Sequence, residues 1–419
     1  MPSRALLAVV TGTVLALAVT ACSSGNGSPG WRDGGGGDGD GGEKKAVASV
    51  TISAPATGAT DVPASTGIEF DVKEATKAVV ELKGADGEAV EGQASADGKS
   101  WLPDGQLEYG ATYTATVTAT GSDGKPATAT TTFTTMKKPA KQVRVTSFLG
   151  DHQVVGVGMP LIVKFNRAIP QDYRDDLQRR MTVRSNPPQE GAWRWISPTE
   201  VRYRPKEFWQ ANTEISYKVQ AGGLPLGDGW YGRADLTIEA KIGSAFVMTV
   251  DNRTKQMTVT KDGAVIKTIP VSLGKPSTPS SSGTMIVMEK FKHTVFDTLE
   301  ELGPEEGYRT EIDFAQRLTY GGEFIHAAPW SEGKQGRVNV SHGCVNVSMA
   351  NGAWLFERTR IGDPITVRGT ERKLQLGNGW TDWNYSFDEW VKGSAIPYEP
   401  PADNPDTDAS EAPGPTPTA

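Results

Sequence analysis

Cysteine is nearly absent from this chain of 419 residues, which contains only Cys22 and Cys344. One disulfide at most could form, so a disulfide scaffold does not account for the fold. Basic residues are not in surplus: 43 Lys and Arg face 50 Asp and Glu, for a formal charge of −7. Without a basic arm or stripe, the chain does not resemble a nucleic-acid-binding protein. The length predicts two to four domains.

Long apolar runs are also missing after the N-terminus, where Arg4 precedes the run Ala5 to Val19. This pattern predicts a secretory signal over residues 1–21, too short to span a membrane. The sequence V-T-A-C that ends at Cys22 resembles a bacterial lipobox, which implies diacylglycerol on Cys22 and an anchor on the extracytoplasmic face of the cell membrane. An ordinary signal with an incidental cysteine is the alternative interpretation.

Lipidation of Cys22 would leave Cys344 as the single thiol of the mature chain. An unpaired cysteine in an oxidising compartment is a candidate reactive group, and a buried inert cysteine is the alternative. Residues 22–45 are rich in Gly and Asp and are expected to form a flexible tether. The Pro-rich residues 396–419 are expected to be a disordered tail.

Short alternating apolar runs, separated by Gly, Asp and Pro turns, fill the region after the tether. They predict two immunoglobulin-like β-sandwiches over residues 46–137 and 138–242, interpreted as spacers. Equal offsets suggest that the two units are a divergent repeat. The matching positions are Pro103, Leu107 and Val117 in the first unit, and Pro205, Trp209 and Val219 in the second.

The third region, residues 243–369, is predicted to be a mostly-β catalytic domain with one or two helices. Ser348 is expected to cap one helix, with Met349, Ala353 and Phe356 on one face and Gly362 at its end. Residues 370–395 are predicted to be a small aromatic subdomain docked on the third domain. Its large rings are Trp380, Trp383, Tyr385, Phe387 and Trp390.

Chemistry is concentrated around Cys344, because two of only four histidines lie in the same region. His326 ends the strand-like run E-F-I-H, and His342 lies two residues before Cys344 in S-H-G-C. A cysteine nucleophile needs a proton acceptor and donors for an oxyanion, which His326 and the backbone near Gly343 could supply. A zinc site made of His326, His342 and Cys344 is an alternative with less support from the spacing.

These motifs closely resemble the L,D-transpeptidase catalytic domain of YkuD type. The similar segments are F-I-H-A-A-P-W, a fourteen-residue spacer, S-H-G-C-V-N, V-S-L-G-K-P-S-T-P, G-T-M-I-V and E-G-Y-R-T. The aromatic segment and the two upstream immunoglobulin-like domains resemble an actinobacterial lipoprotein branch of that family. The resemblance extends over roughly residues 47 to 393.

The resemblance implies that Cys344 is the nucleophile and that His326 accepts and returns its proton. It also implies that the Gly343 and Cys344 amides donate to the oxyanion, beside Ser341 and His342. Ala327 replaces a serine that is common in the family, and its backbone carbonyl is expected to orient His326. The implied substrate-binding residues are Tyr308, Gly321, Gly322, Trp330 and Asn346.

The resemblance further implies formation of 3→3 cross-links in peptidoglycan. Donor tetrapeptide stems and an acceptor diaminopimelate amine would be the substrates, carbapenems would be covalent inhibitors, and no cofactor or metal would be needed. Two alternatives remain at this stage: an L,D-carboxypeptidase that trims the stems, and a non-catalytic cell-wall-binding lipoprotein.

Overall fold

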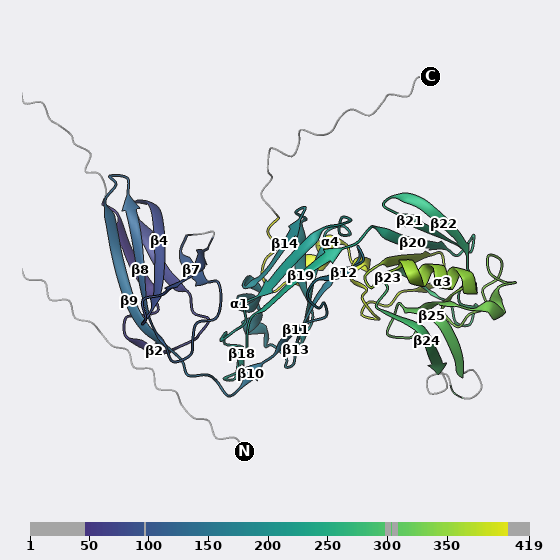
Figure 1. Ribbon diagram of the computed structural model, residues 1–419, viewed down its shortest axis with the longest axis horizontal. Coiled ribbons are helices and arrows are strands. Elements are labelled where there is room, and N and C mark those ends of the chain that lie inside the picture. The colour runs from purple at the N-terminus through teal and green to yellow at the C-terminus, as the bar shows by residue number, and fades with distance from the viewer. Residues whose placement is uncertain (1–46, 96–97, 298–302, 304–308, 401–419) are drawn as a thin grey trace, which may run out of the picture. The chain divides into compact units, whose positions relative to one another are not determined.

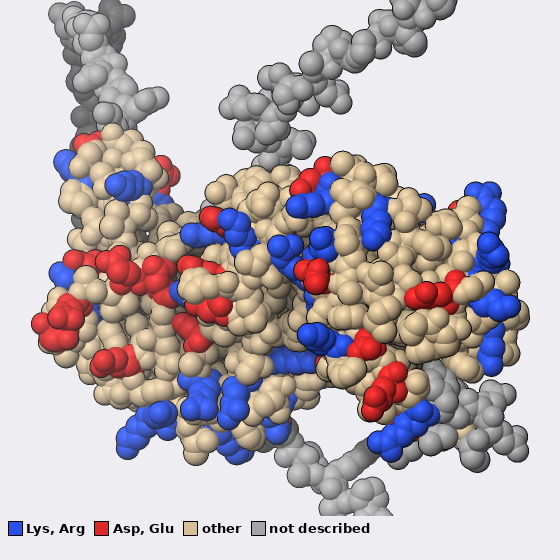
Figure 2. Space-filling model, turned by 45° about the vertical axis from the view of Figure 1, so that its right-hand side comes forward, with Lys and Arg blue, Asp and Glu red and all other residues tan. Residues whose placement is uncertain are grey.

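The protein has a mostly-β, multidomain fold, as the sequence predicts. The structure is a computed structural model that describes residues 47–95, 98–297, 303 and 309–400 (Figure 1). The predicted signal, Cys22, the tether, Tyr308 and the tail beyond residue 400 lie outside the described residues. No helix within the described part of the chain is long and apolar enough to cross a membrane. Figure 2 shows both acidic and basic side chains on the face that it draws.

The first sandwich packs a four-stranded sheet on a five-stranded sheet around its own core, which contains Phe70, Trp101 and Phe133. Its alternating T-Y-T-A-T-V pattern buries every second side chain of the strand from Thr112. The first sheet has the order β1 (Ser49–Ala54), β3 (Ile68–Lys73), β7 (Ser100–Pro103), β6 (Gly92–Ala94). The second has the order β2 (Ala59–Val62), β9 (Pro126–Thr135), β8 (Thr112–Gly121), β4 (Ala75–Gly84), β5 (Ala89–Val90).

The second sandwich repeats this strand arrangement, which supports the predicted internal repeat. One sheet has the order β11 (Val145–Ser147), β13 (Leu161–Phe165), β16 (Glu200–Pro205), β15 (Gly191–Ser197). The other has the order β12 (Gln153–Val155), β19 (Leu236–Ile242), β17 (Glu214–Val219), β14 (Met181–Asn186). Pro103 and Pro205 end equivalent strands, and Leu107 and Trp209, four residues later, are both buried. A short pair, β10 (Gln142–Val143) with β18 (Tyr231–Gly232), and helices η1 (Gln171–Tyr173) and α1 (Arg174–Arg179) complete the unit.

Among its described residues, the third domain contains two sheets, one long helix and the short helix η2 (Pro329–Ser331). The larger sheet has the order β22 (Ala264–Pro270), β21 (Gln256–Lys261), β20 (Phe246–Asp251), β28 (Pro364–Arg368), β23 (Ser281–Ile286), β29 (Arg372–Lys373). The smaller has the order β24 (Glu289–Asp297), β25 (Arg309–Arg317), β26 (Phe324–Ala327), β27 (Val345–Val347). All four side chains of β26 are buried, so this strand lies inside the domain.

The helix after Cys344, α3 (Met349–Arg358), begins where the sequence predicts and ends earlier than predicted. The Ser348 hydroxyl accepts a hydrogen bond from the Asn351 amide at 3.2 Å and caps the helix. The helix ends at Arg358 rather than at Gly362, and its buried residues are Gly352 and Leu355. Gly352 permits close contact with β26, because a Cβ there would lie 2.9 Å from that of Ala327.

The C-terminal segment contacts the third domain, as predicted, and its aromatic rings also pack on the second sandwich, which the prediction did not include. It contains η3 (Asp382–Asn384) and α4 (Phe387–Val391). The Trp390 indole donates to the Ala192 carbonyl at 2.9 Å, and that of Trp383 donates to Gly158 at 2.7 Å. Asn384 also bonds to the third domain, where its side chain accepts from the Thr284 amide and donates to the Thr284 carbonyl.

The second sandwich and the third domain also share apolar packing. Ile286 and Met288 of the third domain, with Trp380, belong to the hydrophobic core of the second sandwich. Such a shared core means that removal of this sandwich would expose apolar surface of the third domain. The spacer interpretation therefore does not suffice for the second sandwich, which also supports the domain that carries Cys344.

We expect Trp390→Ala to destabilise the protein by about 3–5 kcal/mol, because a fully buried ring and its hydrogen bond to Ala192 are lost. Urea unfolding followed by tryptophan fluorescence and circular dichroism measures the effect. Trp330→Ala is the matched control, since the Trp330 side chain is 61% exposed and its loss should leave the free energy of unfolding nearly unchanged. Equal midpoints for both variants would contradict the proposed packing role.

Candidate active site

The register of two parallel strands brings the two sequence motifs together. β26 pairs with β27 so that His326 lies opposite Asn346, and Ile325 lies opposite Val345. Cys344 immediately precedes β27, two residues before Asn346. Side chains two positions apart on an extended strand point the same way, which directs Cys344 to the side of the sheet that carries His326 and Asn346.

A pocket of about 340 Å³ opens at this place and contains most of the predicted residues. Thr310 and Val340 belong to its wall and were missed by the sequence analysis, because neither residue type signals chemistry. The lining residues are Thr310, His326, Trp330, Val340, Ser341, His342, Cys344 and Asn346.

Gly321 and Gly322 lie in the turn before β26 and do not line this pocket. The Cys344 thiol nevertheless reaches this turn and donates to the Gly322 carbonyl, with Sγ and oxygen 3.7 Å apart. The structure therefore brings Gly322 next to Cys344 as a backbone acceptor. The predicted roles of both glycines in substrate binding, and that of Tyr308, remain predictions.

His326 is held in one orientation by its own strand. Its Nδ1 lies 2.9 Å from the Ala327 carbonyl, and since a carbonyl only accepts, Nδ1 carries the proton and Nε2 is the basic nitrogen. Burial lowers the pKa of His326 below its usual value, while the bond to Ala327 and the Asn346 side chain act in the opposite direction. The imidazole is thus neutral near pH 7. Alanine in place of serine at 327 keeps this carbonyl, as expected.

Cys344 is a protonated thiol before any substrate binds. Its side chain is buried beside Phe324, Ile312 and Ala315. Burial, with a smaller contribution from the nearby Glu323 carboxylate and against a backbone hydrogen bond at Phe324, raises the pKa of the thiol to about 12. Because both Cys344 and His326 are neutral, nucleophilic attack by sulfur requires that the proton be transferred during the reaction.

The peptide between His342 and Cys344 is fixed from both sides. The Ser280 hydroxyl donates to the Gly343 carbonyl at 2.7 Å, and the Gly343 amide donates to the Ser341 hydroxyl at 3.1 Å. Gly343 has a φ of +132°, a conformation that side chains other than glycine rarely adopt. The predicted oxyanion role of the Gly343 amide would require that its bond to Ser341 be exchanged for one to substrate.

We expect Gly343→Ala to slow acylation of Cys344 by about 10- to 100-fold, because the strained backbone would move the peptide that carries the thiol. A Cβ at this position would lie no closer than 3.6 Å to its neighbours, so it would not clash with them. The expected loss of rate therefore comes from the unfavourable φ of a residue other than glycine. Rapid-mixing kinetics with a chromogenic β-lactam measures the rate. Gly333→Ala, at a glycine with open surroundings, should retain the wild-type rate. Equal rates for the two variants would refute the argument.

His342 differs from His326 in its surroundings. Its Nε2 lies 3.0 Å from the Lys275 ammonium, at the wall of the pocket. An ammonium only donates, so Nε2 of His342 is already engaged as an acceptor. His326, which is oriented by Ala327, is the better general base. In the part of the chain that the structure describes, no group of three His, Cys, Asp or Glu residues could hold a metal ion.

Comparisons with protein families agree with this architecture. Residues 245–367 match the family model of the L,D-transpeptidase catalytic domain (YkuD), and residues 59–225 match that of a bacterial Ig domain. The fold and the site thus define an L,D-transpeptidase catalytic domain that follows immunoglobulin-like domains.

Similarity to known proteins extends over nearly the whole chain. L,D-transpeptidase 2 of Mycobacterium tuberculosis (strain CDC 1551 / Oshkosh) is 35% identical over 399 residues, which cover 94% of this chain and 96% of the relative. L,D-transpeptidase 5 of Mycobacterium tuberculosis (strain ATCC 25618 / H37Rv) is 33% identical over 362 residues, or 84% and 78% of the two chains. A solved L,D-transpeptidase in complex with imipenem is 32% identical, with a TM-score of 0.48 over 55% of this chain and 100% of that one. The chain belongs to the L,D-transpeptidase family.

Proposed function

We propose that this protein forms 3→3 cross-links in peptidoglycan through a thioester on Cys344. The observation that carries the proposal is the pairing of a buried thiol with an oriented, neutral His326 in one pocket. Family membership supports the transpeptidase reaction, and the site supports cysteine as the nucleophile.

In the first step, the Cys344 sulfur attacks the carbonyl that joins diaminopimelate to the terminal D-alanine of a donor tetrapeptide stem. The thiol proton moves to Nε2 of His326 as the C–S bond forms, and a backbone amide of the S-H-G-C segment stabilises the oxyanion. His326 then gives that proton to the departing amine. The C–N bond breaks, D-alanine leaves and a thioester remains.

In the second step, the side-chain amine of diaminopimelate in a neighbouring stem attacks the thioester carbonyl. His326 takes a proton from this amine and returns it to sulfur as the C–S bond breaks. The new amide is the 3→3 cross-link, and Cys344 is again a thiol. One amide is exchanged for another, so the reaction needs no nucleotide.

We propose that carbapenems acylate the same sulfur. Attack on the β-lactam carbonyl opens the four-membered ring, and the proton from sulfur goes by way of His326 to the ring nitrogen. The adduct retains every atom of the drug, so the intact mass of the protein rises by the drug's full mass.

Incubation of the purified protein with disaccharide-tetrapeptide tests the transferase assignment. Cross-linked dimer together with free D-alanine is the expected product, and tripeptide alone would identify a carboxypeptidase instead. Absence of both products and of any carbapenem adduct would leave the cell-wall-binding lipoprotein as the better description. The three outcomes are distinguished by mass spectrometry of the products and of the protein.

We also propose a lipid anchor on Cys22 that holds the enzyme at the extracytoplasmic face of the membrane. The support is the V-T-A-C sequence directly after the apolar N-terminal run. Metabolic labelling with an alkyne fatty acid should mark the wild-type protein and not Cys22→Ala. Labelling of both proteins, or of neither, would refute the anchor.

A further inference from the structure

A buried carboxylate lies directly behind the nucleophile and takes no part in the reaction described above. Glu323 is 5% exposed and immediately precedes β26, the strand of His326. Its Oε2 accepts from the Ser281 amide at 3.1 Å and its Oε1 from the Ser281 hydroxyl at 2.7 Å. Oε1 also forms an ion pair with Arg372. A buried carboxylate requires such compensation, because desolvation of an isolated charge is costly.

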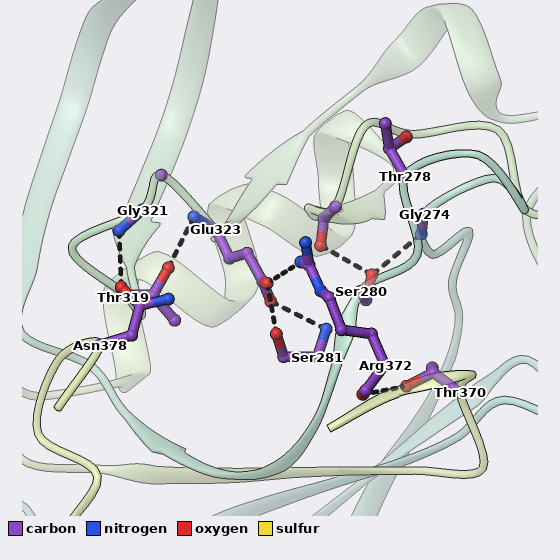
Figure 3. A network of polar contacts seen from close by, with 12 residues as sticks. Gly274, Thr278, Ser280, Ser281, Thr319, Gly321, Glu323, Thr370, Arg372 and Asn378 are labelled. Atoms are coloured by element: carbon purple, nitrogen blue, oxygen red, sulfur yellow. Dashed lines mark hydrogen bonds and ion pairs between the residues drawn. The ribbon is translucent and has the colours of Figure 1, made fainter. Parts of the chain in front are cut away.

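Arg372 reaches Glu323 from the short edge strand β29, which pairs in parallel with β23 so that Arg372 lies opposite Ser281. Figure 3 shows dashed lines from the Glu323 carboxylate to both Ser281 and Arg372. The same C-terminal loop makes a second contact with this turn, since the Gly321 amide donates to the Asn378 side chain at 2.8 Å. The loop therefore braces the turn whose Gly322 carbonyl accepts the thiol.

Both charges lie next to the peptide that carries Cys344. A Cβ built on Gly343 would be 3.6 Å from Cγ of Glu323 and 3.7 Å from Nη2 of Arg372. The negative charge of Glu323 acts against a thiolate on Cys344, and it raises the pKa of that thiol. A cation on the same carboxylate opposes this effect.

We propose that Arg372 is a positioning residue that neutralises Glu323 behind the Gly343–Cys344 peptide, so that sulfur can give up its proton to His326 during acylation. This inference rests on the proposed acyl transfer at Cys344. The loop after β28, which carries Arg372, would then contribute to catalysis although it does not line the pocket.

Among the described residues, three further titratable groups lie at or beside the pocket. His326 lies on β26, His342 on the S-H-G-C segment and Lys275 on the loop before β23. None of them changes in the variants below, so a difference between variants reports on Glu323 and Arg372.

The test measures alkylation of Cys344 by iodoacetamide in the full chain at about pH 9, where the rate follows the thiolate fraction. Mass spectrometry of the tryptic peptide 338–358 reports Cys344 separately from Cys22. Arg372→Gln leaves the carboxylate uncompensated and should slow alkylation by about threefold, the result of a one-unit rise in pKa partly offset by greater nucleophilicity. Glu323→Gln should accelerate alkylation by about the same factor.

Two further variants separate charge from folding. The double variant Glu323→Gln/Arg372→Gln should return to near the wild-type rate, and Arg372→Lys should retain most of it. Arg358→Gln removes a surface ion pair with Glu357 on α3 and should have no effect, and its Cys344 peptide is read as residues 338–360 because the cleavage site at 358 is lost. Circular dichroism confirms that each variant is folded.

Opposite changes in the two single variants support the inference. Changes in the same direction, or none, would overturn it and leave the pair with a structural role alone. Carbapenem labelling of the wild type is measured in parallel: if it fails, the proposed function fails, while the alkylation rates still decide the charge effect.

Discussion

Cys344→Ala is expected to abolish labelling by a carbapenem and to reduce D-alanine release by at least about 10⁴-fold. Cys344 supplies the only thiol among the pocket-lining residues, and the oriented His326 would have no nucleophile to deprotonate. Removal of one buried sulfur leaves a small cavity that costs about 1–2 kcal/mol, so the variant should remain folded. Intact-mass spectrometry and a coupled D-alanine assay measure the two effects.

Cys22→Ala is the matched control, since it removes the other cysteine of the chain. This variant should take up one equivalent of carbapenem, as the wild type does. A drug adduct on Cys344→Ala, or loss of the adduct from Cys22→Ala, would show that Cys344 is not the acylated residue.

The sequence was sufficient to predict the fold class and the centre of the site. The alternating runs correctly predicted two sandwiches, and the equal offsets from Pro103 and Pro205 correspond to equivalent strands in both. The family resemblance of the two motifs also predicted that His326 and Cys344 act together, and the parallel pairing of β26 with β27 places both on one face of the sheet. Local patterns carry this information, since they fix strand period and pairing.

Contacts between distant segments could not be predicted in the same way. The buried face of α3 depends on the close approach of Gly352 to Ala327, and Gly352 has no amphipathic signal of its own. Likewise, Glu323 looks like an ordinary charged residue beside a strand until Ser281 and Arg372 are brought to it from other elements. These contacts join segments that are distant in the sequence, and no local propensity indicates them.

His326→Gln is expected to reduce the rate of Cys344 acylation by about 10²- to 10⁴-fold, because the oriented imidazole that would accept the thiol proton is lost. Glutamine can still donate to the Ala327 carbonyl, so the loss reports on proton transfer rather than on packing. His152→Gln, at an exposed histidine of the second sandwich, should leave the rate unchanged. Stopped-flow kinetics with a carbapenem measures the acylation rate of the wild type and of both variants.

The pH dependence of the acylation rate tests whether His326 is the general base. Only the unprotonated imidazole can act as base, and burial lowers the pKa of His326 below 6.5. The acylation rate of the wild type should therefore be constant from neutral pH down to about 6.5 and should fall only in more acid solution. That acid limb must vanish in His326→Gln. A limb with its midpoint above 6.5, or one that persists in His326→Gln, would place the essential base elsewhere, with His342 beside Lys275 as the next residue to replace.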